Sequence, residues 1–316
     1  MQIEIERDDR KPRYQSGAFL HQDSFLAGDK SLLFEQIVNG VTQGGIYALI
    51  ALGFTIIFGT LRLVTFAHGE VFMAGAFLGY TVMRYLHGSL WLGILAAILC
   101  SGLLGIIIER IGFHFLRRAP HQSSLLITIG FSILLINLAQ LIWGPETQSI
   151  SSLKYGDFQI FGIYISYAQV IVLAVTFVLM GIIRILIYKT KTGRTIRATA
   201  QDFEAAYAMG VNIDLVFMLT FALGSLLGGI AGMLVGFYYN AFYPTMGTLP
   251  GLKAFSACIL GGLTSLGGAV AAGFILGIVE NLSVAYISSS YRDVFSFGIL
   301  ILVLIVRPKG LFGREV

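Results

Sequence analysis

A few ionisable side chains lie inside long apolar stretches of this 316-residue sequence, where a charge is costly and therefore indicates a function by default. His68 and Glu70 begin one such stretch. Because they are two positions apart, a regular helix would point them about 200° away from each other, so they form no obvious pair and no metal site. We expect them to anchor their segment near a membrane surface, with the lining of a gate as the alternative.

Further polar side chains fall at helical spacings within apolar runs. Residues three or four positions apart share one face of a helix, and a polar face inside a membrane either lines a route for a solute or forms hydrogen bonds to other helices. Both interpretations stay open for Glu280 and its neighbour, which lie deepest. The candidates for lining a path are Asn39, Gln43, Tyr47, Asn137, Gln140, Glu280 and Asn281.

Enzyme chemistry has little support in the sequence. There is no HExxH or GxSxG motif, the five histidines are scattered, and no His, Asp or Glu residues have metal-ligand spacing. Cys100 and Cys258 lie far apart in apolar runs, as small buried hydrophobic residues do. We therefore expect no catalytic residue, no metal site and no cofactor held by this chain.

The elements that position these residues are indicated by the composition. Only 12% of the residues are charged and 56% are hydrophobic, whereas soluble domains carry about 25% charged residues. This excludes a soluble enzyme, a disordered tail and a disulfide-stapled fold. The 38 glycines favour closely packed transmembrane helices, because small residues let helix backbones approach each other in lipid.

The apolar runs predict an all-α bundle with about 8 spans plus a short broken or re-entrant segment, since about 20 apolar residues cross a bilayer. The segment 252–287 is too long for one ordinary span, and the sequence GGLTSLGG at 261–268 is expected to break it. The predicted spans are 34–60, 63–86, 90–109, 123–143, 166–188, 214–238, the two limbs of 252–287, and 290–306.

Residues 1–32 differ from the rest of the chain. They hold five Lys or Arg and six Asp or Glu residues, and no apolar run long enough for a secretory signal. We interpret them as a polar, charged extension of unassigned role that precedes a transmembrane domain at 33–316.

The remaining basic residues predict the orientation. Eleven of these 16 fall at Arg62, in the stretch 110–118, in the cluster 189–197 and in the tail 307–314. Because cytoplasmic loops are enriched in Lys and Arg, this pattern places the N-terminus outside and the C-terminus in the cytoplasm. The exceptions, apart from Arg184 inside a span, are Arg84, Lys154, Lys253 and Arg292.

The loop at about 189–213 is too polar to lie in lipid. Residues 195–209 are good helix formers, and Gly210 follows them as a break. This pattern predicts a short cytoplasmic helix that ends sharply at Gly210 and can occupy a groove on a partner protein. An ordinary amphipathic loop is the alternative.

The motif Glu204-Ala205-Ala206-x-x-x-Gly210 resembles the EAA loop of bacterial ABC importer permeases. Its surroundings resemble one family more specifically, the branched-chain amino acid permeases, and most closely the LivH-type subunit. The segments that carry this resemblance are GRTIRATAQDFEAAYAMGVN (193–212), NGVTQGGIYALIALGFTIIFG (39–59), FAHGEVFMAGAF (66–77), GLKAFSACILGGLTSLGGAVAAGFILGIVE (251–280) and YRDVFSFGILILVLIVRPKGLFG (291–313).

The resemblance implies a permease subunit of an ATP-driven importer in the bacterial inner membrane, carrying branched-chain or other neutral, hydrophobic amino acids. Its implied partners are a second, related permease, two ATP-binding subunits that hold ATP and Mg, and a periplasmic substrate-binding protein; nucleic acid is not among them. Glu204, Ala205, Ala206 and Gly210 would then couple the chain to the ATPase. The sequence has no P-loop, as a permease subunit requires, although a secondary carrier would also lack one.

Two features depart from the family pattern. The charged extension is longer than the resemblance leads us to expect, and Gly267 stands where members often have proline. Two other functions stay in competition: a permease of a urea or short-chain amide ABC importer, whose first spans are similar, and a self-contained secondary carrier or channel.

Overall fold

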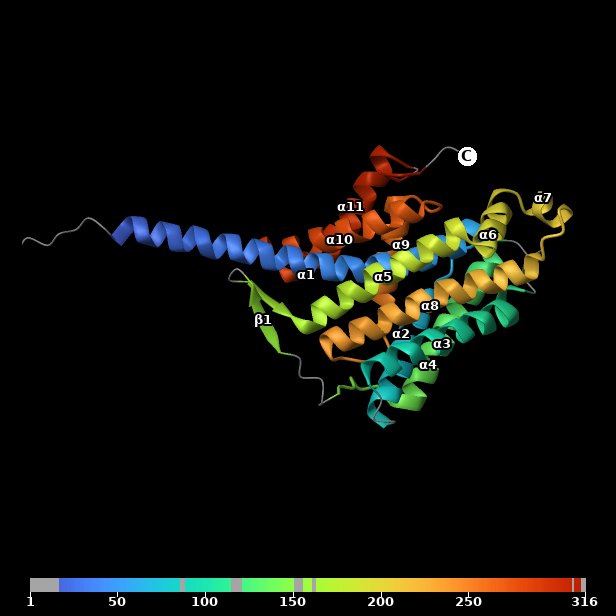
Figure 1. The fold of residues 1–316 in the computed structure, drawn as a ribbon, viewed down its shortest axis with the longest axis horizontal. Helices are drawn as coiled ribbons and strands as arrows, with labels where there is room; N and C mark the ends of the chain where they lie inside the picture. Colours follow the sequence, from blue (N-terminus) through green and yellow to red (C-terminus); the bar gives the residue numbers. More distant parts are fainter. Residues whose placement is uncertain are drawn as a thin grey trace, which may run out of the picture.

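The computed structural model shows an elongated bundle of helices (Figure 1). It describes residues 17–85, 89–114, 121–150, 156–160, 163–308 and 310–313, with the side chains of 17–32, 121–124, 160 and 163 left aside. The long helices are α1 (Gly17–Leu61), α2 (His68–Tyr85), α3 (Leu90–Ile108), α4 (His121–Trp143), α5 (Tyr167–Lys189), α8 (Ile213–Tyr239), α10 (Leu266–Tyr286) and α11 (Arg292–Val306). The short ones are α6 (Lys191–Gln201), α7 (Phe203–Ala208), α9 (Thr248–Gly261), the π-helical turn η1 (Glu109–Phe113) and the 3-10 turn η2 (Ser289–Tyr291).

The predicted all-helical membrane fold is confirmed. Within the described residues, seven helical stretches are long and apolar enough to cross a membrane. The predicted span at 63–86 corresponds to α2, which is not among the seven. Most of α2 is buried inside the protein, so its surroundings are other helices and it needs less apolar surface than a helix facing lipid.

One element was not predicted. Residues Asp157–Ile160 (β1) and Ile163–Ser166 (β2) pair as a two-stranded antiparallel hairpin, with Asp157 opposite Ser166. The hairpin lies between α4 and α5, in a segment that the sequence marks only as a connection between two spans. Four-residue strands give too short an alternation of polar and apolar residues to be distinguished from a loop.

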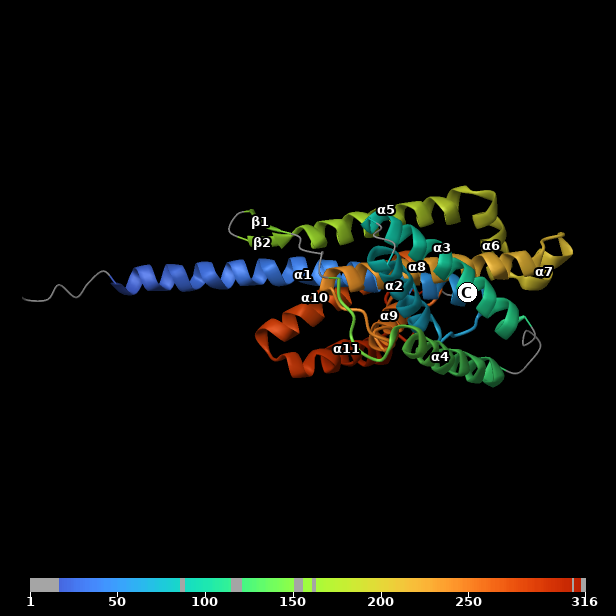
Figure 2. The ribbon, with the colours of Figure 1, turned by 90° about the horizontal axis from the view of Figure 1, so that it is seen from below.

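The helices form an inner and an outer group. In Figure 2, α5 lies on one side of α1 and α8, while α9, α10 and α11 lie on the other. Of the most apolar stretch of each helix, 83% is buried in α1 and 67% in α8, against 11% in α4 and 6% in α11. The core therefore lies around α1, α2 and α8, and the outer helices expose apolar faces to whatever surrounds the chain.

Glycines hold the inner helices together, as their number in the sequence predicted. A Cβ atom on Gly44 would lie 2.7 Å from the Cα of Phe274, and one on Gly40 would lie 2.7 Å from the Cα of Ile278. In the same way Gly75 of α2 lies directly against Gly229 of α8. Larger residues at these positions would force the helix backbones apart.

The predicted break in 252–287 is present between α9 and α10. Gly262 has φ +99°, a backbone conformation that favours glycine, and the side chain of Ser265 caps α10 by accepting from the Gly268 N–H at 3.2 Å. A Cβ atom on Gly267 would meet no other atom within 4 Å. The turn is therefore made by Gly262, and it does not depend on which residue occupies position 267.

The first helix is longer than the predicted span. Its membrane-length apolar part is Leu33–Leu61, and residues 17–32 continue the same helix beyond the bundle (Figure 1). The second half of the predicted extension is thus helical, while residues 1–16 lie outside the described residues.

The two ends of the bundle differ. We call the end with α6 and α7 the basic end, because Arg62, Arg194 and Arg197 line one groove there together with Thr264 and Leu266 of the α9–α10 turn. The C-terminal tail joins the same end, since the Leu311 N–H donates to the Leu260 carbonyl at 2.8 Å. We call the other end, which carries β1 and β2, the hairpin end.

Candidate functional site

Glu280 is the centre of a buried polar cluster and is itself 0% exposed. Its carboxylate accepts hydrogen bonds from the Tyr47 hydroxyl at 3.1 and 3.2 Å and from the Ser296 hydroxyl at 3.1 Å. These contacts join α10 to α1 and α11. A carboxylate that is buried and fully bonded in this way stabilises helix packing.

Two basic side chains neutralise the cluster. Lys253 Nζ lies 3.0 Å from Glu280 Oε1 and 2.7 Å from Asp293 Oδ1, and the Arg292 guanidinium pairs with the same Glu280 oxygen. Two positive and two negative charges therefore meet within the bundle. Lys253 and Arg292 are exceptions to the distribution of Lys and Arg that predicts the orientation. Their pairing with the buried Glu280 explains why they occur in these segments.

The polar face of α1, made by Asn39, Gln43 and Tyr47, forms hydrogen bonds to three neighbouring helices. Asn39 Oδ1 accepts from Gln169 of α5 at 2.5 Å, and Gln43 Oε1 accepts from the Tyr239 hydroxyl of α8 at 2.9 Å. Tyr47, one turn further on, donates to Glu280 of α10. All three residues therefore form hydrogen bonds between helices, and a role in lining a path stays a prediction.

The other path candidates are not brought together. Asn137 and Gln140 lie on the exposed side of α4, where the Asn137 amide donates to the Ile133 carbonyl of its own helix at 2.7 Å. Asn281 is half-buried and donates to the Gly277 carbonyl at 2.9 Å.

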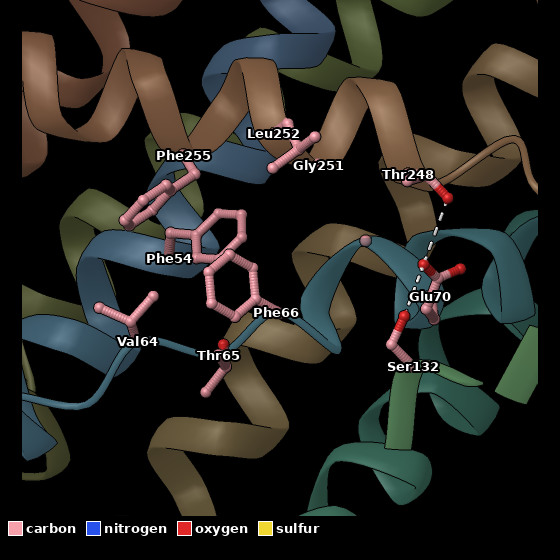
Figure 3. Close-up of a pocket in the computed structure, with 11 residues that line it drawn as sticks. Phe54, Val64, Thr65, Phe66, Glu70, Ser132, Thr248, Gly251, Leu252 and Phe255 are labelled. Carbon is pink, nitrogen blue, oxygen red and sulfur yellow. Dashed lines mark hydrogen bonds between the residues drawn. The ribbon is translucent and has the colours of Figure 1, made fainter. Parts of the chain in front are cut away.

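A pocket that the sequence did not predict lies beside α9 (Figure 3). Its walls come from α1, the connector before α2, the first turn of α2, α4 and α9. Figure 3 shows phenyl rings gathered on one side and a carboxylate on the other. The lining residues are Phe54, Val64, Thr65, Phe66, Gly69, Glu70, Ser132, Thr248, Gly251, Leu252 and Phe255.

Glu70 is the acid of this pocket, and it is only 2% exposed. Its Oε1 accepts from the Ser132 hydroxyl at 3.1 Å and from the Thr248 hydroxyl at 3.4 Å, whereas its Oε2 is buried without a hydrogen-bond partner. Thr65 Oγ1 is likewise buried and unpartnered. No Lys, Arg or His side chain is among the residues that line the pocket.

His68 and Glu70 do not act together, as their spacing predicted. The His68 ring packs on Phe54 with the ring centroids 4.5 Å apart, and only Glu70 lines the pocket. Both residues are 2% exposed. They therefore lie inside the protein, and their role in anchoring the segment near a membrane surface stays a prediction.

The loop at 189–213 folds as two short helices where the sequence predicted one. Asp202 separates α6 from α7 and caps α7, accepting from the Ala205 N–H at 2.9 Å. Gly210 has φ +83° directly after α7, so the predicted sharp turn is present. Asp202 carried the signal for this split, because Asp is a preferred residue at the start of a helix.

The four residues of the EAA-like motif have different surroundings. Ala206 is 5% exposed and packs with Ile213 and Phe217 of α8, which attaches α7 to the bundle. Glu204, Ala205 and Gly210 are exposed. The aromatic and thioether side chains of Tyr207 and Met209, 71% and 86% exposed, continue this surface.

The groove at the basic end adjoins this surface. It lies between the end of α1, α6 and the α9–α10 turn. Arg62, Arg194 and Arg197 give it a positive charge, and no acidic residue lines it. The groove thus lies between α6 and the turn that precedes α10.

Metal-binding groups are not assembled in the part of the chain that the structure describes, where no three His, Cys, Asp or Glu side chains gather to hold an ion. The residues that sequence reasoning missed are the partners in space: Lys253, Arg292 and Ser296 around Glu280, and Ser132 and Thr248 around Glu70. Unpaired basic residues in apolar segments were the one signal that pointed to the first group.

One family of known proteins matches most of this chain. Residues 36–304 match the family described as "Branched-chain amino acid transport system / permease component". The high-affinity branched-chain amino acid transport system permease proteins LivH of Salmonella typhimurium and Escherichia coli K12 are 38% and 39% identical to it over 293 residues. The corresponding protein BraD of Pseudomonas aeruginosa is 36% identical over the same length.

Each of these alignments covers 89% of this chain and 95% of the relative. Among solved structures, PsaBC from Streptococcus pneumoniae in complex with Fab superposes with a TM-score of 0.46 at 15% sequence identity, covering 91% of this chain and 97% of that chain.

Proposed function

Because the chain belongs to the family of branched-chain amino acid transport system permease components, we propose that it carries branched-chain or other neutral, hydrophobic amino acids across the bacterial inner membrane. The chain is the permease component of an ABC transport system and is not itself catalytic. ATP is hydrolysed on separate subunits, and a separate binding protein delivers the substrate.

One structural observation supports the coupling role most directly. The α6–α7 unit lies at the basic end, outside the transmembrane core, and exposes Glu204, Ala205 and Gly210 beside the groove that contacts the α9–α10 turn. An ATPase subunit bound here can transmit its movement to α1 and α8, on which α6 packs. Ala206 contributes by holding α7 on α8.

The orientation follows from the same arrangement. The basic end carries Arg62, Arg110, Arg194 and Arg197, so it faces the cytoplasm under the positive-inside rule. The hairpin end then faces the periplasm, where a substrate-binding protein docks. Arg117, Arg118, Lys154, Lys309 and Arg314 lie outside the described residues.

A second, related permease completes the membrane part in this proposal. The outer helices α4 and α11 bury few of their residues within the chain. Gln140 is a polar residue on the exposed side of α4, and a polar group in the bilayer is more stable against protein than against lipid. This face of α4 therefore suits contact with the second permease.

The test is reconstitution of the complete transporter in liposomes with its binding protein. We expect uptake of radiolabelled leucine that requires ATP and stops when the P-loop lysine of the ATPase subunits is replaced. Uptake driven by an ion gradient with this chain alone would instead support a secondary carrier. Uptake of urea or a short-chain amide, with none of leucine, would assign the substrate to the alternative ABC class.

A further inference from the structure

The Glu70 pocket has the chemistry of a site for an organic cation that carries an apolar group. Glu70 is buried with one oxygen unpartnered, and the residues around it offer hydroxyl groups and phenyl rings but no positive charge. A buried carboxylate without a counter-charge is unfavourable, so a positively charged ligand would gain from binding there.

The opposite side of the pocket suits an aliphatic side chain. Phe54, Phe66 and Phe255 surround it, with the rings of Phe54 and Phe255 5.6 Å apart and those of Phe66 and Phe255 6.4 Å apart. Apolar groups that enter such an aromatic enclosure are removed from water, which favours their binding.

The pocket is also accessible from outside the chain. Phe66 and Leu252 are 40% and 39% exposed at its mouth, and Thr248 is exposed as well, whereas Glu70 lies buried at its base. These exposed residues come from the connector before α2 and from α9.

We propose that this pocket binds the amino acid during its passage, with Glu70 accepting hydrogen bonds from the ammonium group and Phe54, Phe66 and Phe255 surrounding the aliphatic side chain. This assignment rests on the proposed function, since it takes the substrate to be a neutral, hydrophobic amino acid.

The first test is direct binding of leucine to the assembled transporter without the binding protein, in competition with two probes. 3-Methylbutylamine carries the ammonium without the carboxylate, and 4-methylpentanoate carries the carboxylate without the ammonium. Glu70→Gln keeps both accepted hydrogen bonds and loses the charge. We expect it to weaken competition by the amine roughly tenfold to a hundredfold and competition by the acid much less, as the loss of one charge-assisted contact predicts.

Glu146→Gln is the matched control, because Glu146 is exposed and is not among the residues that line the pocket. It should bind both probes as the wild type does. Equal competition by the amine in the wild type and in Glu70→Gln would overturn the proposal.

A second variant keeps the test valid if Glu70→Gln does not fold. Phe66→Trp adds volume at the partly exposed mouth, so it narrows the pocket without enlarging a side chain in the buried core. It should lower ATP-driven leucine uptake roughly tenfold with the ATPase of the complex still assembled. Full uptake by this variant would overturn the proposal, whereas absence of leucine uptake by the wild type would overturn the proposed function itself.

Discussion

Lys253 of α9 and Glu280 of α10 form an ion pair at 3.0 Å across the two limbs of a broken helix. Both side chains are buried, and 27 residues separate them in the sequence. The pair fixes how the limbs lie against each other, while Gly262 at the break lets the chain reverse. The arrangement of α9 against α10 therefore depends on one charge pair and one glycine.

Replacement of this lysine should be strongly destabilising. Lys253→Met leaves Glu280 with less compensation, and breaking a buried pair on one side costs about 3–5 kcal/mol of the free energy of unfolding. Thermal unfolding of the purified protein in detergent measures the loss. Lys189→Met, at an exposed lysine, should unfold as the wild type does, and Lys253→Met with Glu280→Met should recover part of the loss.

The packing of α1 on α10 should tolerate no side chain at Gly44. A Cβ atom there would lie 2.7 Å from Phe274 Cα, so Gly44→Val should lower stability by about 1–3 kcal/mol or more. Gly181→Val is the control, because a Cβ on Gly181 of α5 meets nothing within 4 Å. Similar unfolding temperatures for both variants would contradict the close approach of α1 and α10.

Charge reversal on α7 should uncouple transport without affecting the fold. Glu204 is exposed, so Glu204→Lys should insert normally and lower ATP-driven leucine uptake by about tenfold or more, since an unfavourable charge at an interface costs several kcal/mol. Gly210→Trp should also lower uptake, in this case by straining the turn after α7, because φ +83° disfavours any side chain. Normal uptake and normal ATPase rates in either variant would exclude this coupling role.

The two alanines of the motif should respond differently to enlargement. Ala206 is buried against α8, so Ala206→Leu should lower stability by about 1–3 kcal/mol. Ala205 is exposed, so Ala205→Leu should keep the unfolding temperature and reduce the affinity for the ATPase subunits. Co-purification with those subunits, measured beside thermal unfolding, separates the two effects.

A cysteine introduced on α4 should reveal contact with the second permease by cross-linking to it. In a background without Cys100 and Cys258, Gln140→Cys is expected to cross-link to a cysteine on the partner permease in the assembled transporter. Val178→Cys, on the exposed side of α5, serves as the comparison. Cross-linking at 178 but not at 140 would place the permease contact on α5 instead.

Much of the fold was predictable because it depends on local sequence. Long apolar runs predicted the spans, the glycine-rich segment at 261–268 predicted the break, and Gly210 predicted the end of α7. Each of these signals lies within the element that it determines. The hairpin β1–β2 was missed because its strands are short, and the split at Asp202 because one capping residue was read as part of a helix.

The site was less predictable because its contacts join distant parts of the chain. Tyr47 and Glu280 are 233 residues apart, and Glu70 and Thr248 are 178 residues apart. No spacing rule connects such residues, so the sequence marked Tyr47 and Glu280 as polar without showing that they bond to each other. Ser132 and Thr248 carried no signal, since hydroxyl residues are common in membrane helices.

The short helix α9 also has a mechanical consequence. Thr248 and Phe255 on one side line the Glu70 pocket, Lys253 on another side pairs with Glu280, and the turn that follows adjoins the groove beside α6. Fourteen residues make a rod about 21 Å long, so a tilt of about 10° at the α6 end displaces Thr248 by roughly 4 Å. A displacement of that size would break the 3.4 Å hydrogen bond from Thr248 to Glu70, so a rigid tilt of α9 at one end would change the pocket at the other.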